Sequence, residues 1–205
     1  MKRSKMLALT TLCECLIFVV LFSPKLVGDE GTKSAAPKVI PLKSIYSTSR
    51  QEGLISVDQR TADQSLREEV QRLHKRALGM GASNVFLARG NDIRSAASAT
   101  QLAFSSIEPV NEPVGQELKS DTLWLVAYLG VAGSNPPNWE IKSAEVDINR
   151  VRLVYTEEGS VDADAYAYFI WVPLGKLDPG TYTLELFDEN QREVVLSRRV
   201  KVSRK

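Results

Sequence analysis

The stretch KLDPGTYTLELFDEN, residues 176–190, decides the fold class because it contains a turn and then a strand. Pro179 pre-sets φ for the second position of a turn, and Gly180 supplies the positive φ of the third, which is the chemistry of a type II turn. From Tyr182 to Leu186 apolar residues alternate with polar ones, so that one side of the chain is apolar. This alternation predicts a strand with one face buried in a sheet.

The second half of the chain repeats the strand signal from Thr122 onward. Its apolar segments are rich in Val, Ile, Leu, Tyr and Trp, and short stretches of Gly, Pro, Asn and Asp separate them. In order they are TLWLVAYLG, WEIKSAEV, VRLVYTEE, YAYFIWVPL, TYTLELFD and EVVLSRRVKV. Short strands at this turn-punctuated spacing predict an antiparallel β-sandwich or barrel.

The motif L-x-P-G-x-Y, Leu177–Tyr182, resembles the tyrosine corner of immunoglobulin-like and fibronectin-type sandwiches. The resemblance implies that the hydroxyl of Tyr182 bonds to the backbone near the turn and pins the strand. It indicates an immunoglobulin-like fold for this half of the chain and says nothing of a ligand.

A longer stretch, LVAYLGVAGSNPPNWEIKSAEV, followed by a hairpin and an aromatic strand, is similar in order to chagasin-like cysteine-protease inhibitors. It also resembles the C-terminal sandwich domain of PrcB-type protease-complex subunits. These families place a loop rich in Asn-Pro or Pro-Thr-Gly-Gly after an early strand, with an aromatic residue behind it. The resemblance implies a protein that associates with or inhibits a protease. The chain departs from the pattern at Pro137-Asn138, where the families have the glycines that let their loop approach a protease cleft.

This loop supplies the candidate binding residues, which are Asn135, Pro136, Pro137 and Trp139. Two consecutive prolines stiffen the loop, which reduces the entropy lost on contact, and the tryptophan gives it an aromatic ring. The alternative is that Trp139 begins a strand and is buried, because a tryptophan in a sandwich usually belongs to the core.

The first half has a different pattern, with strands and helices in turn over residues 39–107. Its first helix lies in TADQSLREEVQRLHKRALGMG, where Thr61 and Gln64 form a capping box and Gly79 marks the exit. SNVFLARG predicts a short buried strand, and a second helix follows it. Residues 108–121, EPVNEPVGQELKSD, have no period and predict a Pro-rich linker. The predicted fold is α+β: a small N-terminal α/β unit, the linker, and a C-terminal antiparallel immunoglobulin-like β-sandwich over 122–205.

The N-terminus has the order of a secretory signal: basic residues, the apolar run Met6–Phe22, and Gly28 as a small residue at the exit. We expect a signal peptide or N-terminal anchor over 1–28, a linker over 29–38, and export to the periplasm, cell envelope or medium. An uncleaved anchor, which would be the chain's contact with a membrane, and a cytoplasmic protein with a misread start are the alternatives. Cys13 and Cys15 both lie in the apolar run, so a cleaved chain has no cysteine for a disulfide.

The charge balance argues against a nucleic-acid partner, because such proteins need a strongly basic surface. The whole chain has 26 Lys and Arg against 25 Asp and Glu, and removal of residues 1–28 leaves 22 against 24. The basic run SRRVKVSRK predicts a strand with a solvated charged face, with a patch for an anionic partner as the alternative. We therefore expect a protein as the partner.

The sequence has few residues that could carry chemistry. His74 is the single histidine, and no motif places a nucleophile or an orienting acid near it, so a surface helix position is favoured over a catalytic base. The segment GMGASN follows a helix, so it predicts a helix end rather than a dinucleotide loop. The acidic loop Glu157–Asp164 is a solvated loop or an exposed calcium site. We expect no catalytic residue, metal or cofactor, with an enzyme site between the two units or a purely structural envelope role as the alternatives.

Overall fold

The computed structural model describes residues 36–57, 63–77, 83–106, 116–119, 122–132, 139–157 and 166–203, and Ser34–Lys205 form one compact unit. The helices are α1 (Gln64–Ala77) and α2 (Ile93–Ser106), with a short 3-10 helix η1 (Leu42–Ser44). The strands of the first half are β1 (Lys38–Ile40), β2 (Tyr46–Ser47), β3 (Ile55–Ser56), β4 (Asn84–Arg89) and β5 (Gln116–Lys119). The strands of the second half are β6 (Thr122–Ala132), β7 (Trp139–Asp147), β8 (Arg150–Glu157), β9 (Tyr166–Lys176), β10 (Gly180–Asp188) and β11 (Glu193–Ser203).

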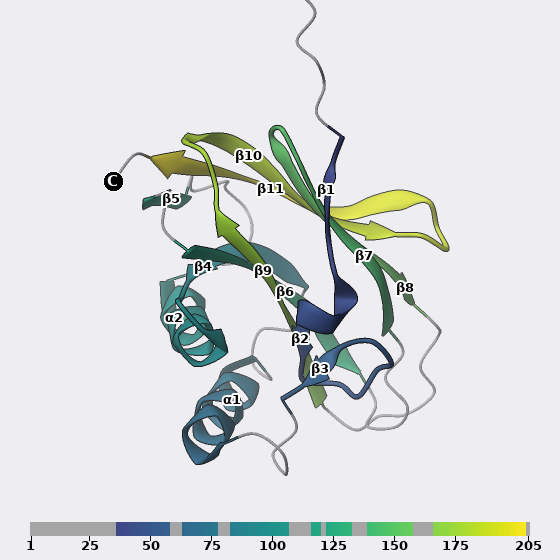
Figure 1. Cartoon of the computed structure of the whole chain (residues 1–205). Helices are drawn as coiled ribbons and strands as arrows, with labels where there is room; N and C mark the ends of the chain where they lie inside the picture. Colours follow the sequence, from purple (N-terminus) through teal and green to yellow (C-terminus); the bar gives the residue numbers. More distant parts are fainter. Residues whose placement is uncertain are drawn as a thin grey trace, which may run out of the picture. The chain divides into compact units, whose positions relative to one another are not determined.

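The described elements form three layers (Figure 1). A five-stranded sheet in the order β3-β2-β9-β6-β4, the inner sheet, carries α1 and α2 on one face. Its other face packs on a six-stranded sheet in the order β1-β7-β8-β10-β11-β5, the outer sheet. The α+β class is confirmed, and the two sheets have the arrangement of a β-sandwich with a helical layer added.

The inner sheet is buried on both faces, which explains the unbroken apolar runs of its long strands. In β6, Leu123 and Leu125 face the core between the sheets, while Trp124 and Val126 face the helices. Strands β9 and β4, on either side of β6, divide their side chains between the same two cores. Successive side chains of a strand point to opposite faces, so a strand that is apolar throughout needs cover on both sides.

The expected division into separate units over 39–107 and 122–205 is corrected by the strand pairing. Ile40 of β1 pairs with Ala144 of β7, and Phe86 of β4 pairs with Val126 of β6. The two halves of the chain thus complete the same sheets. The predicted linker also contains a strand, because β5 within it pairs with β11.

The sequence predicts an antiparallel sandwich, but the outer sheet contains parallel strand pairs. β10 runs parallel to β8, and β5 runs parallel to β11. The reason for the first pair is that β9, which connects β8 to β10, lies in the inner sheet, so the chain returns to the outer sheet in its original direction.

The predicted tyrosine corner is confirmed in its central contact. The hydroxyl of Tyr182 donates a hydrogen bond to the carbonyl oxygen of Asp178 at 3.1 Å, and its side chain is buried. The turn chemistry was wrong in detail, because Gly180 has no positive φ and begins β10. Gly175 instead has a positive φ, of +77°. It pairs with Leu123 of β6, and the register between β6 and β9 shifts at the next residue, Trp124, which pairs with Pro173.

Helix α1 lies where the sequence predicts it, with an apolar face of Leu66, Val70, Leu73 and Ala77 buried against the inner sheet. Within the described part of the chain, neither helix combines the length and the apolar character that a bilayer crossing requires. The predicted signal or anchor over 1–28 lies outside the described residues.

Candidate functional site

Strand ends of both sheets meet at one end of the sandwich, and we call it the loop end (Figure 1). Trp139, the first residue of β7, pairs with Glu157, the last of β8. Ala132 at the end of β6 pairs with Tyr166 at the start of β9. The end of β6, the beginning of β7, the end of β8 and the beginning of β9 therefore lie at this end. The turn between β10 and β11 lies there too, because Asp188 at the end of β10 is level with Tyr155 near the end of β8.

The turn at the loop end is held by the carboxylate of Asp188. The Oδ1 atom of this buried side chain accepts hydrogen bonds from the backbone N–H of Asn190 at 2.8 Å and of Gln191 at 3.2 Å. Arg192 completes the turn with φ +57°, a left-handed conformation that is uncommon for a non-glycine residue. The turn residues are exposed while their backbone is tied to a buried acid.

Two further hydrogen bonds tie the same turn to the end of β8. The backbone N–H of Glu189 donates to the carbonyl oxygen of Tyr155 at 2.8 Å. The side-chain amide of Asn190 donates to the carbonyl oxygen of Glu157 at 2.9 Å. A surface segment with this many backbone contacts has little conformational entropy left to lose when a partner binds it.

The phenol of Tyr155 beneath the turn is a structural group. Its side chain is buried, and burial, with smaller contributions from Asp188 and Glu157, raises the pKa of Tyr155 to about 12. The phenol therefore stays neutral at physiological pH and fills the core below the loop end.

The predicted binding residues are placed only in part. Trp139 is 8% exposed, and its ring meets that of Tyr168 edge-on, with centroids 4.7 Å apart and an interplanar angle of 74°. Of the two roles considered for Trp139, the structure thus shows the core position. Asn135, Pro136 and Pro137 lie outside the described residues.

The sequence reasoning did not single out the turn between Asp188 and Glu193. Its polar letters DENQRE mark a hairpin turn, which was a usable signal. Its attachment to β8 depends on the parallel pairing of β8 with β10, which no local pattern shows.

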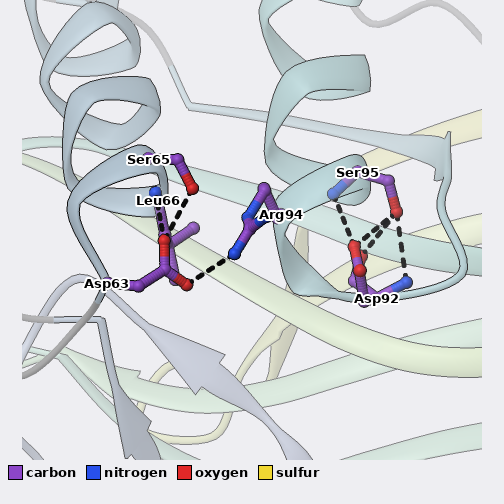
Figure 2. A network of polar contacts seen from close by, with 6 residues as sticks. All are labelled: Asp63, Ser65, Leu66, Asp92, Arg94 and Ser95. Carbon is purple, nitrogen blue, oxygen red and sulfur yellow. Dashed lines mark hydrogen bonds and ion pairs between the residues drawn. The ribbon is translucent and has the colours of Figure 1, made fainter.

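A second polar cluster lies at the beginnings of the two helices, and Figure 2 shows it. Asp63 caps α1 by accepting from the N–H of Leu66 at 3.0 Å, and its other carboxylate oxygen accepts from Arg94 at 2.8 Å. Hydrogen bonds from Ser65, Leu66 and Arg94, in that order of size, hold the pKa of Asp63 well below its usual range. Asp63 is thus the capping residue of α1, in place of the predicted pair of Thr61, which lies outside the described residues, and Gln64.

Helix α2 begins with a matching contact in the same cluster. Asp92 accepts from the N–H of Ser95 at 2.8 Å, and the hydroxyl of Ser95 accepts from the N–H of Asp92 at 3.1 Å. The backbone N–H and the hydroxyl of Ser95 both donate to the Asp92 carboxylate, and these two hydrogen bonds lower its pKa. Each carboxylate caps the N-terminus of one helix. The ion pair between Asp63 and Arg94 joins the beginnings of the two helices, so the cluster has a structural role.

The buried hydroxyl groups of β2 and the residues after it also serve the backbone. The hydroxyl of Thr48 accepts from the N–H of Phe169 at 2.9 Å, and the N–H of Thr48 donates to the carbonyl of Phe169 at 3.1 Å. The hydroxyls of Ser47 and Ser49 bond to each other at 2.8 Å. The two Thr48–Phe169 bonds continue the pairing of β2 with β9 beyond the two residues of the strand.

His74 is not the surface residue that the sequence predicted. Its ring is half-buried against the inner sheet and stacks on Phe169, with centroids 6.3 Å apart and an interplanar angle of 11°. Burial lowers the pKa of His74 to about 4, so the imidazole is neutral in the folded chain near pH 7.

Among the described residues, no three His, Cys, Asp or Glu side chains lie close enough together to hold a metal ion. Of the acidic loop, Glu157 ends β8 and residues 158–164 lie outside the described ranges. Comparison of the chain with protein-family models, with curated proteins and with solved structures gives no match.

Proposed function

We propose that this chain is an exported, non-enzymatic protein that binds a protein partner through the loop end of an immunoglobulin-like sandwich. Its role would be that of an envelope accessory protein that associates with or inhibits a protease. The observation that supports this most is the fixed turn at Asp188–Glu193, beside the strand ends that lead into the Asn-Pro-Pro loop.

The physical reason is preorganisation. Binding costs free energy for every segment that it orders, and a turn already held by Asp188, Tyr155 and Glu157 costs less. Loops at one end of a two-sheet scaffold are the usual contact surface of immunoglobulin-like domains. The exposed side chains of Glu189, Gln191 and Glu193 supply polar contacts there.

The alternative, an enzyme site between two units, requires two separate units with a junction between them. Val85 of β4 and Leu125 of β6 lie in one core, so the described parts of the two ranges meet in packed side chains rather than at a junction between domains.

Site-specific cross-linking in the producing cells tests the proposal. A photo-reactive amino acid at Gln191, in the exposed turn, should cross-link to one protein species, and the same group at exposed Lys75 on α1 should not. The double substitution of Pro136→Ala and Pro137→Ala should weaken that cross-link at equal folded protein. Equal cross-linking from both positions, or from Lys75 alone, would place the contact elsewhere.

The protease role has its own assay. The purified chain, titrated against a papain-like cysteine peptidase and against serine and metallopeptidases, should inhibit one class at near-equimolar amounts. A chain that cross-links through Gln191 and inhibits none of them is a binding protein without the inhibitor role.

A further inference from the structure

The outward face of the outer sheet carries three rows of side chains that follow from its register. Val154, Phe187 and Val194 are level across β8, β10 and β11. The next row toward the β7–β8 hairpin contains Glu145, Arg152, Glu185 and Ser197, and the one after it contains Asp147, Arg150, Thr183 and Arg199. Their chain neighbours point inward and are mostly buried, so these rows lie on the opposite face. Among the described residues no third layer covers this face.

The first row is apolar and partly accessible. Val194 is 41% exposed, and Phe187 and Val154 are half-buried. The guanidinium of Arg152 lies over the ring of Phe187, 4.9 Å from its centroid, and pairs with Glu185 at 2.7 Å. A row of this kind gains free energy when a second surface removes it from water.

Charge is distributed unequally across the same face. On the β7 side the outward residues Glu145 and Asp147 are acidic. On the β11 side Arg199 is basic and exposed, and Lys201 follows two positions later. Across β7, β8, β10 and β11 the face is therefore acidic on the β7 side and basic on the β11 side, and the apolar row crosses it nearer the loop end.

We propose that this face binds a second copy of the chain. The two outer sheets stack face to face with their strands in the same direction, so that β7 lies over β11 of the second copy and β8 lies over β10. The rows then match: Asp147 opposes Arg199 of the second copy, Arg152 opposes Glu185, and Val154 opposes Phe187.

The charges select this arrangement over its alternative. Stacking with the strands reversed would set β7 on β7 and β11 on β11, which brings acid to acid and base to base. Like charges in contact are costly, and complementary pairs fix orientation more than they add affinity. The affinity in the proposed arrangement comes from the apolar row.

The geometry of stacked sheets allows these contacts. Sheets pack about 10 Å apart with strands about 30° from alignment, which displaces the outer strands by one or two residues. An arginine side chain spans such a displacement. Four strands of seven residues give a face of roughly 15–20 by 25 Å, which is a small interface that suits a concentration-dependent dimer.

The test uses sedimentation of the full chain in a mild non-ionic detergent over a range of concentrations. The wild type should pass from monomer to dimer. Asp147→Arg and Arg199→Asp should each weaken dimerisation about tenfold or more, because each creates two like-charge contacts. An equal mixture of the two variants should recover a dimer. One of its two contacts then joins Arg at 147 to Asp at 199, and the other keeps the original Asp147–Arg199 pair. Lys75→Glu, a change of the same size on α1, should have no effect.

Circular dichroism of each variant checks that it folds. Val194→Lys is a second test variant, because it places a charge in the apolar row and leaves the Asp147–Arg150 ion pair intact. It should weaken the dimer as well. A wild type that stays monomeric at its highest soluble concentration overturns the proposal. So does a dimer that the mixture of charge variants fails to restore. The cross-linking test at Gln191 concerns a different surface, so its result is independent of this one.

Discussion

Replacing Trp139 with alanine should destabilise the fold, because the structure places this ring in the core between the two sheets. The side chain is 8% exposed and makes an edge-on contact with Tyr168 at 4.7 Å. Truncation of a buried tryptophan leaves a cavity and costs about 3–5 kcal/mol of unfolding free energy. That is a large part of the 5–15 kcal/mol by which natural domains are typically stable.

Urea unfolding followed by far-ultraviolet circular dichroism measures this loss without relying on the fluorescence of the deleted ring. Trp139→Phe should lose less, since a phenyl ring keeps part of the contact with Tyr168. Val39→Ala, at a strand residue that is 62% exposed, is the control and should change stability by less than about 0.5 kcal/mol. A Trp139→Ala chain with wild-type stability and a weaker partner cross-link would refute the core assignment.

Tyr182→Phe removes the hydroxyl that donates to Asp178 and should cost about 0.5–1.5 kcal/mol by urea unfolding, with the Gln191 cross-link unchanged per folded molecule. His74 should make stability depend on pH: its pKa is about 4 when folded and about 6.5 when unfolded, so the unfolded state gains a proton first as the pH falls. Stability should drop by about 2–3 kcal/mol between pH 6.5 and 4, and a His74→Gln chain should lose that component. A fragment of residues 122–205 should give broad, protease-sensitive unfolding, and a cooperative transition like that of the full chain would contradict the shared sheets.

The strands of the outer sheet could be predicted from sequence because each has one buried and one outward face. In β8 and β10 apolar and polar residues alternate, as in VRLVYTEE and TYTLELFD. The tyrosine corner belongs to the same class of signal, since Asp178 and Tyr182 are neighbours in the chain. These features are local, so the sequence contains all of the information that they need.

The layer order was missed because it depends on pairing between distant segments. The runs LWLVAYLG and AYFIWVPL lack alternation, which indicates strands buried on both faces, and the chain has an amphipathic helix available to cover one of them. Treating the two halves as separate units hid that connection. The same holds for the loop end, where the attachment of Asn190 to Glu157 follows from the parallel pairing of β8 and β10.

The shared sheets also explain why the second half should not fold alone. Without residues 36–106, β6 would lose the pairing of β4 along six residues, and Trp124, Val126 and Tyr128 would lose the helices that cover them. The indole of Trp171 would lose its hydrogen bond to Thr100, and the hydroxyl of Tyr128 its bond to the carbonyl of Ala77. Large aromatic side chains and a free strand edge would then face water together, which favours aggregation over a cooperative fold. The loop end rests on β6 and β9, so any protein that presents it needs the helical layer of the first half as well.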